Sequence, residues 1–307
     1  MKNNQQNMID VIGDIHGHAD KLEELLLKLG YAKSNGAYSH PDRKVLFVGD
    51  YIDRGPKIRE TLQIVRAMVE SKNAIALMGN HEYNALCFHI HHPAGGHLRP
   101  HLIKNIDQHY QTLKAFHGKQ HELDDYLEWF KSLSIFYEDD QLRAVHACWN
   151  EDNIAFLKSI SGASLTDKQI YESTIKGTAM YRAFDQTLKG IEIKMPTGMY
   201  WEDHEKNIRS EIRTRWWENP AKMSYRSISV ESIDQLPDSP VDPDSLPTME
   251  YYNSTKPVFF GHYWLNGTPQ LLKNNVCCVD YSIAKGGKLV AYRLNGKNLE
   301  DKNLIYV

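Results

Sequence analysis

Three short apolar runs near the start of the chain each end at a glycine, and polar side chains follow at once. Runs of this length are typical of strands that are buried on both faces of a parallel sheet. Glycine lets the backbone turn sharply and approach a ligand closely. The runs, with the polar groups that follow them, are 8–12 with Asp14 and His16, 45–49 with Asp50 and Asp53, and 73–78 with Asn80 and His81.

Helical patterns separate these predicted strands. Apolar residues recur at helical spacing over 22–29 and again over 58–69. Alternating strands and helices predict a parallel sheet flanked by helices, with the carboxyl ends of its strands along one edge. Open α/β sheets bind ligands at that edge, so we expect the polar groups to converge there. Taken alone, 49–56 is also compatible with a surface turn that carries a salt bridge.

Two lone histidines extend this series of polar groups at strand ends. His146 ends a predicted strand at 142–146, and His262 follows another at 257–261. A lone histidine after a strand is usually a structural residue, but its place in this series favours a role in the site. The remaining strands are predicted over 135–137, 276–280 and 288–293.

We expect a single domain over residues 1–307, with two insertions that form a cap. The first insertion holds eight histidines within 87–121. We interpret them as packing or substrate contacts rather than a metal site, because no carboxylate or cysteine interleaves with them at ligand spacing. The core is expected over about 8–86, 133–149 and 256–307, and the cap over about 87–132 and 150–255.

Basic side chains in the cap are candidates for binding an anionic substrate. Arg209 and Arg213 are four residues apart and would share one face of a helix. They are interpreted equally as a second phosphate clamp or as an exposed basic helix, with Trp216 and Trp217 in the core. Four further candidates, or else members of a solvated face, are Arg99, His101, Lys104 and His109.

Composition argues against several kinds of partner and site. The net charge of −3 provides no bulk charge for a nucleic-acid or membrane surface, and no apolar run approaches membrane-spanning length. Residues 1–7 are polar and lead into the first strand, so we expect no signal peptide. The four cysteines include no CxxC pair, which favours buried thiols in a cytoplasmic protein over a cysteine zinc site.

The groups at the strand ends form a ligand set for two metal ions. Two carboxylates, one amide oxygen and three imidazoles suit divalent first-row metals, most simply manganese, with iron or zinc as alternatives. Two such ions activate a water and clamp a phosphoryl oxygen during in-line attack. Asp50 suits the bridging position, because a carboxylate can offer one oxygen to each ion. The six predicted ligands are Asp14, His16, Asp50, Asn80, His146 and His262.

Three further residues suit the hydrolysis of a phosphate bond. His81 follows Asn80 directly and is a candidate general acid for the leaving oxygen. Asp53 would orient His81 and raise its pKa. Arg54 would bind phosphate through two parallel hydrogen bonds. We therefore expect a small phosphorylated substrate, with a phosphoprotein as the alternative, and no nucleic-acid or membrane partner.

Three motifs follow one another along the chain: GDIHG (13–17), GDYIDRGP (49–56) and GNHE (79–82). Together with the later His146 and His262, they closely resemble the calcineurin-like metallophosphoesterases. The DRG in the second motif is similar to the phosphoprotein phosphatase branch, which includes the bacterial symmetrical diadenosine tetraphosphate hydrolases. The resemblance implies a four-layer α/β/β/α sandwich. It also implies that one metal is held by Asp14, His16 and Asp50 and the other by Asp50, Asn80, His146 and His262, with His81 and Asp53 as the acid pair and Arg54 on phosphate.

The chain departs from the family pattern in two places. GHYW at 261–264 lacks the second histidine of the wider superfamily, and HAC at 146–148 replaces the HGG that is usual in protein phosphatases. The tail 278–294 is similar to the nucleotide-hydrolase side of the branch. These features favour a two-metal phosphoesterase that acts on small nucleotide-type substrates such as dinucleoside polyphosphates. The alternatives are a Ser/Thr or Tyr protein phosphatase and a non-catalytic module that binds metal or phosphate.

Overall fold

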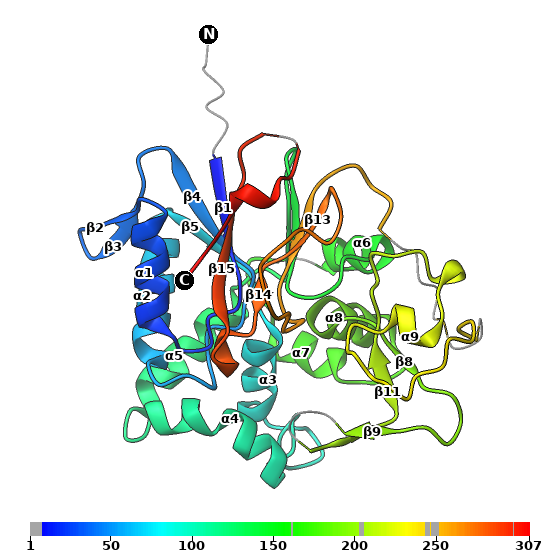
Figure 1. Cartoon of the computed structure of the whole chain (residues 1–307). Coiled ribbons are helices and arrows are strands. Elements are labelled where there is room, and N and C mark those ends of the chain that lie inside the picture. The colour runs from blue at the N-terminus through cyan, green and yellow to red at the C-terminus, as the bar shows by residue number, and fades with distance from the viewer. Residues whose placement is uncertain (1–7, 161, 203–205, 243–245, 247–251, 297) are drawn as a thin grey trace.

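Two β-sheets lie at the centre of the molecule, with helices on their outer faces (Figure 1). The structure, a computed structural model, describes residues 8–160, 162–202, 206–242, 246, 252–296 and 298–307. Residues 1–7, where no signal peptide is expected, lie outside the described part. Within that part, no helix is both long and apolar enough to cross a membrane.

The first sheet contains the three strands that the sequence predicts near the start of the chain. β4 pairs in parallel with β1 on one side and with β5 on the other, which confirms the predicted parallel arrangement. β15 runs antiparallel to β1 and also pairs with β14 and β16. The strands are β1 (Met8–Ile12), β4 (Arg43–Phe47), β5 (Ala74–Ala76), β14 (Asp280–Tyr281), β15 (Lys288–Arg293) and β16 (Leu304–Tyr306).

The second sheet is built from the middle and the end of the chain. β12 pairs in parallel with both β7 and β13, and β6 runs antiparallel to β7. Because β7 and β12 are neighbours in the sheet but far apart in sequence, the long segment between them leaves the sheet and returns beside it. The strands are β6 (Phe136–Glu138), β7 (Arg143–Val145), β12 (Val258–Phe260) and β13 (Val276–Cys278).

The alternation of side chains along the strands explains the layers. Val11 and Leu46 of the first sheet join Phe259 of the second in one buried cluster between the sheets. Their sequence neighbours point the other way: Phe47 and Phe260 lie in the cluster that the helices cover. Successive strand residues face opposite sides of a sheet, so each strand contributes apolar side chains to both layers. The result is the predicted order of helices, sheet, sheet and helices.

Helices α1 and α2 cover the first sheet, and α6 and α8 lie beside the second (Figure 1). Short paired strands and 3-10 helices complete the described part. The α-helices are α1 (Ala19–Lys28), α2 (Ile58–Glu70), α3 (Asn80–His89), α4 (Ile103–Ala115), α5 (Gln120–Lys131), α6 (Glu151–Ile160), α7 (Asp167–Ser173), α8 (Ala179–Lys189) and α9 (Tyr225–Ile228). The other elements are β2 (Ala32–Ser34), β3 (Ala37–Ser39), β8 (Glu192–Lys194), β9 (Trp201–Glu202), β10 (Ile208–Arg209), β11 (Glu211–Arg213), η1 (Pro220–Lys222), η3 (Ile283–Lys285) and η4 (Asp301–Asn303).

The segment around Arg209 and Arg213 differs from its predicted conformation. These arginines do not share a helical face, because they lie on two short strands, β10 and β11. β11 pairs with β8, so the segment satisfies its backbone through a partner strand more than ten residues away in sequence. The expectation for Trp216 and Trp217 is confirmed, since both side chains are buried. The four cysteines are also buried free thiols, as predicted.

Candidate metal centre

The strand ends of both sheets converge through turns that only glycine fits. Gly49 ends the run of β4 with a φ of 111°, in a region that L side chains rarely adopt. A Cβ at Gly49 would lie 2.5 Å from the backbone nitrogen of Gly79, which begins the neighbouring turn. The two glycines therefore let the loops that follow β4 and β5 touch, and this brings Asp50 close to Asn80.

Several residues with side chains also hold left-handed backbone conformations in these loops. His16, Asp50 and His262 have φ values of 48°, 55° and 70°. Such conformations cost free energy and persist only where the surroundings fix them, and they concentrate at functional sites. Here the backbone N–H of His16 donates to the carbonyl of Asp50 over 2.8 Å, which ties the first loop to the second.

Glu82 also fixes these loops, through hydrogen bonds to their backbone. The sequence alone assigned no role to this residue. Its fully buried carboxylate accepts backbone N–H bonds from Asp50, Tyr51 and Gly79 at 2.8–3.0 Å. Burial, followed by the repulsion of Asp50, raises the pKa of Glu82 to about 7. The available sequence signal was its position as the third residue of α3, where a carboxylate can bond the backbone that precedes a helix.

Asp50 lies at the centre of the converging side chains. One of its carboxylate oxygens, Oδ2, is 3.5 Å from His16 Nε2 and 3.4 Å from His146 Nε2. Within the described residues, two groups have ligand atoms close enough to share a metal ion, and Asp50 belongs to both. One group is His16, Asp50 and His81, and the other is Asp50, His146 and His262.

The ring nitrogens that face Asp50 are suited to binding a cation. His16 Nδ1 lies 3.0 Å from the carbonyl oxygen of Ile52 and must donate to it, which leaves a lone pair on Nε2 of the neutral ring. Burial lowers the pKa of His16 to about 4, although Asp50 opposes this shift, so the ring is neutral at pH 7. His16 Nε2 and Asp14 Oδ1 are buried without a hydrogen-bond partner. A divalent cation would satisfy both atoms.

Asn80 brings the second group together. Its side-chain oxygen lies 2.9 Å from His146 Nε2 and 2.8 Å from His262 Nδ1. His146 Nδ1 is 2.8 Å from the carbonyl oxygen of Val48, so this nitrogen carries the proton of the neutral ring and Nε2 faces Asn80 with a lone pair. Burial lowers the pKa of His146, but Asp50, the carbonyl of Val48 and Glu82 together raise it above its usual value, so a proton competes with a metal ion for Nε2.

Buried acidic groups accumulate around the same point. Asp14, Asp50, Glu82 and Asp280 are each at most 2% exposed. Burial first, and then repulsion from Asp280 and Asp50, raises the pKa of Asp14 well above its usual range. Uncompensated buried charge is strongly destabilising, and nearby cations offset it. The donor set and its negative charge therefore fit two divalent cations.

Asp14 lies beside this centre but outside the two groups with converging ligand atoms. Its Oδ2 accepts the backbone N–H of His262 over 3.0 Å, which joins the loop after β1 to the loop after β12. The group of converging ligand atoms around His16 and Asp50 contains His81, whereas the family resemblance implies Asp14 as the third ligand. The structure thus brings all six predicted ligands into one buried region, with Asp14 at its border.

His81 and Asp53, the candidate acid pair, are in direct contact. His81 Nδ1 is 2.6 Å from Asp53 Oδ2, and His81 Nε2 points toward Asp50 at 3.9 Å. Burial lowers the pKa of His81, but Asp50 and then Asp53 outweigh burial and raise it to about 9. An imidazolium with one N–H fixed by a carboxylate can donate its other proton toward the metal centre.

The arginines that were candidates for phosphate binding occupy different positions. The guanidinium of Arg54 lies 5.5 Å from the ring centre of Trp264, beside the loop that carries His262. Arg213 donates from Nη1 to the carbonyl oxygen of His262 over 3.2 Å and from Nε to Glu231 over 2.8 Å. Arg209 is exposed on β10. Of the two downstream arginines, Arg213 is the one that touches the ligand loop.

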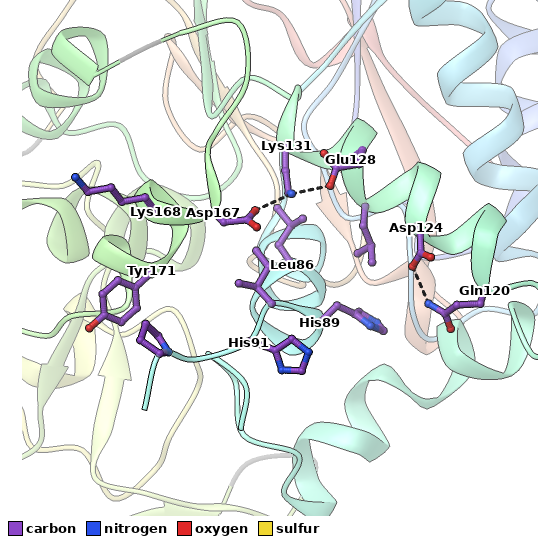
Figure 2. A pocket seen from close by; sticks show the side chains of 13 residues that line it. Leu86, His89, His91, Gln120, Asp124, Glu128, Lys131, Asp167, Lys168 and Tyr171 are labelled. Atoms are coloured by element: carbon purple, nitrogen blue, oxygen red, sulfur yellow. Dashed lines mark hydrogen bonds and ion pairs between the residues drawn. The ribbon is translucent and has the colours of Figure 1, made fainter. Parts of the chain in front are cut away.

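A cavity of about 670 Å³ lies between α3, α5 and α7, toward the end of α3 that is remote from Asn80 (Figure 2). Leu86 and His89 of α3, Asp124 of α5 and Tyr171 of α7 are among its lining residues. Three histidines of the same segment, His91, His97 and His101, stack on one another or on Phe88. The ring centres of His97 and His101 are 3.9 Å apart, for example.

The profile of the calcineurin-like phosphoesterase family matches residues 8–174, which is more than half of the chain. The chain belongs to this family. Membership identifies the protein as a hydrolase of the metallophosphoesterase type, and the use of divalent metal ions follows from the family. This phosphoesterase therefore carries its candidate metal ligands in the fold that the resemblance implies.

Relatives of this phosphoesterase match it over a limited stretch. It is 51% identical over 73 residues to the asymmetrical bis(5′-nucleosyl)-tetraphosphatase PrpE of Halalkalibacterium halodurans, and 49% identical over 74 residues to that of Oceanobacillus iheyensis. Each match spans 24% of this chain and 30% of the relative. A protein serine/threonine phosphatase from Saccharomyces cerevisiae superposes with a TM-score of 0.51 at 15% identity, over 100% of this chain and 80% of that one. That likeness shows a shared fold.

Proposed function

We propose that this chain is a two-metal phosphoesterase that hydrolyses small nucleotide-type substrates such as dinucleoside polyphosphates. The observation that carries this proposal is the approach of His16 Nε2 and His146 Nε2 to a single oxygen of Asp50, with His81 on the same carboxylate. A buried carboxylate that faces imidazoles on both sides would suit a pair of divalent cations, which could then activate a water.

The ligands are assigned as the sequence motifs imply. Manganese is the simplest choice for this set of oxygen and nitrogen donors, with iron or zinc as alternatives. When bound, two such ions supply a nucleophilic water at neutral pH and offset charge on the phosphoryl oxygens. The first ion would be held by Asp14, His16 and Asp50, and the second by Asp50, Asn80, His146 and His262, as the family resemblance implies.

The residues of the chain then manage binding and proton transfer. Arg54 binds the phosphoryl oxygens, and Arg213, which contacts the carbonyl of His262, is the candidate for a second clamp. As the water oxygen, which has given one proton to solvent, bonds to phosphorus, the bond from phosphorus to the leaving oxygen breaks. His81 gives its Nε2 proton to that oxygen, while Asp53 holds the ring through Nδ1.

The substrate class rests on sequence rather than on geometry. The matched relatives are named as nucleosyl tetraphosphatases, and HAC at 146–148 departs from the pattern of protein phosphatases. The insertions 87–132 and 150–255 are proposed to form a cap around the substrate. A Ser/Thr or Tyr protein phosphatase is the alternative activity, and a non-catalytic module that binds metal or phosphate is the second alternative. A cytoplasmic location remains part of this proposal.

A substrate panel tests the proposal. The metal-stripped protein is supplied with manganese and assayed on p-nitrophenyl phosphate, diadenosine tetraphosphate and phosphopeptides, with Asp50→Asn as the control. We expect manganese-dependent turnover that chelation abolishes, with diadenosine tetraphosphate preferred over phosphopeptides. Phosphopeptide preference would favour the protein phosphatase, and manganese binding without turnover would favour the non-catalytic module.

The products on diadenosine tetraphosphate provide a second readout. Symmetrical cleavage gives two molecules of ADP, whereas asymmetrical cleavage gives ATP and AMP. The PrpE relatives are named as asymmetrical enzymes, while the DRG motif resembles a branch that includes symmetrical ones. Chromatography of the nucleotides therefore shows on which phosphorus the centre acts.

A further inference from the structure

We propose that His109 and Thr112 of α4 are positioning residues that hold Asp53, and through it His81, in the orientation needed to protonate the leaving group. This inference rests on the proposed function, because it assigns a role within the same acid pair. It adds to the site a helix of the first insertion, which supplies none of the predicted metal ligands.

The carboxylate of Asp53 is held from two sides. Oδ2 faces His81 Nδ1 at 2.6 Å, and Oδ1 accepts a bond from His109 Nδ1 at 3.0 Å and one from Thr112 Oγ1 at 2.5 Å. The backbone N–H of Asp53 in turn donates to Thr112 Oγ1 over 3.1 Å. Thr112 thus bonds both the side chain and the backbone of Asp53, a residue in the left-handed conformation with φ at 63°.

The proton positions are consistent with this arrangement. An ionised carboxylate only accepts hydrogen bonds, so His109 must carry its proton on Nδ1. His109 Nε2 lies 3.3 Å from His89 Nε2, close enough for one of the two nitrogens to donate to the other. Burial, followed by repulsion from His109, lowers the pKa of His89 to about 4, so His89 is neutral at pH 7 and has one proton to donate. His109 therefore bonds Asp53 through one ring nitrogen and faces His89 with the other.

The surroundings leave His109 little freedom to adopt another role. Its side chain is 7% exposed, and its ring centre lies 5.1 Å from that of Phe88. His89, the next member of the chain of bonds, lines the cavity beside α3 (Figure 2). Three hydrogen bonds from neighbouring elements thus fix the carboxylate of Asp53, and two of them come from α4. Without the two bonds from α4, Asp53 could rotate about its side-chain torsions, and His81 would lose its fixed orientation.

The experiment measures how the rate depends on the leaving group. Phenyl phosphate has a poor leaving group that needs a proton, whereas the p-nitrophenolate of p-nitrophenyl phosphate leaves readily without one. The manganese-loaded full chain is assayed on both esters as wild type and as His109→Leu, His109→Asn and Thr112→Val. His109→Asn keeps an N–H donor near the position of Nδ1, and Thr112→Val keeps the shape of the side chain. His81→Ala is the reference variant.

We expect His109→Leu and Thr112→Val to lower kcat on phenyl phosphate about 10- to 100-fold and to change kcat on p-nitrophenyl phosphate much less. His109→Asn should restore most of the loss, and the metal content of all variants should stay at the wild-type level. Should His109→Leu fail to fold, Thr112→Val carries the same test alone.

The reference variant separates two ways of failing. If His81→Ala loses rate preferentially on phenyl phosphate while His109→Leu and Thr112→Val do not, this inference is wrong and the acid pair stands. If His81→Ala lowers both rates equally with its metals retained, His81 is not the acid, and the inference is overturned together with that part of the proposed function.

Discussion

Two sets of histidines in this molecule differ in what faces their free ring nitrogens. Two strand-end histidines, His16 and His146, are held by backbone carbonyls through Nδ1, and their other nitrogens face Asp50. In the histidine-rich segment 87–121, three rings stack, as with His97 on His101 and Phe88 on His101 at 3.9 and 3.8 Å. A high number of imidazoles is therefore a weaker sign of a metal site than a few that face acidic oxygens.

Removal of a strand-end histidine should have the largest effect. We expect His146→Ala to lose one bound metal and to lower turnover on the order of 1,000-fold, because a charge-stabilising group in the centre is lost. Metal content by mass spectrometry and turnover on p-nitrophenyl phosphate check this. His91→Ala removes an imidazole from the histidine-rich segment and is the matched control. Two ions retained by His146→Ala would remove His146 from the ligand set.

Loss of the acid should come next and should spare the metals. We expect His81→Ala to lower kcat on phenyl phosphate about 100- to 10,000-fold, as is typical for a positioned acid, and to keep both ions. The comparison requires metal analysis of the same preparation that is assayed. A fall in metal content would reassign His81 as a ligand, in line with its position near His16 and Asp50.

Removal of Arg54 should weaken phosphate binding without loss of the bound metal ions. We expect Arg54→Ala to raise the inhibition constant of inorganic phosphate about 10- to 100-fold, the effect of losing hydrogen bonds between charged groups. Arg209→Ala is the control from the exposed strand β10. An unchanged inhibition constant for Arg54→Ala would refute its role in binding.

The next prediction concerns the histidine-rich segment, where His89 should make the stability of the protein depend on pH. Burial lowers the pKa of His89 to about 4, below its usual value of 6.5. The unfolded chain therefore binds more protons at this residue, and its contribution to stability is present above pH 6.5 and lost as pH falls toward 4. In urea unfolding, we expect His89→Gln to depend less on pH over this range than wild type. The exposed His117→Gln controls for the loss of an imidazole, and equal pH dependence of His89→Gln and wild type would contradict the prediction.

The smallest effect is expected within the stacked rings. His97→Leu should leave the metal content unchanged and alter turnover by less than about two-fold, the size of effect usual for substitutions away from a site. Metal analysis and the p-nitrophenyl phosphate assay are sufficient. A large loss of bound metal would show that the stacked rings, too, contribute to the centre.

Sequence alone predicted the parts of the fold whose signals are local. The apolar runs that become β1 and β4, and the polar turns after them, are visible as short contiguous patterns. α3 was not predicted, because eight of its ten residues are buried and it has no polar face to reveal a helical period. The strands β10 and β11 were not predicted for a different reason, because their pairing depends on partner strands that sequence spacing does not indicate.

The candidate site likewise contains residues that the sequence predicts and residues that only the structure reveals. The six proposed ligands follow predicted strands, so their convergence could be inferred from topology. Glu82 and His109 act through contacts with residues 31 and 56 positions away, Tyr51 and Asp53, and no spacing rule links such pairs. The structure was needed to separate His109, which reaches Asp53, from the other histidines of its segment.

Asn80 and His81 are consecutive residues in the first turn of α3. A cation ligand and a proton donor on one rigid turn keep a constant separation wherever the helix moves. If both roles hold, this constant separation sets the distance between the phosphorus under attack and the leaving oxygen in any substrate that reacts. If the insertions 87–132 and 150–255 form a cap as proposed, variation in them can change which molecules enter, while that span stays the same.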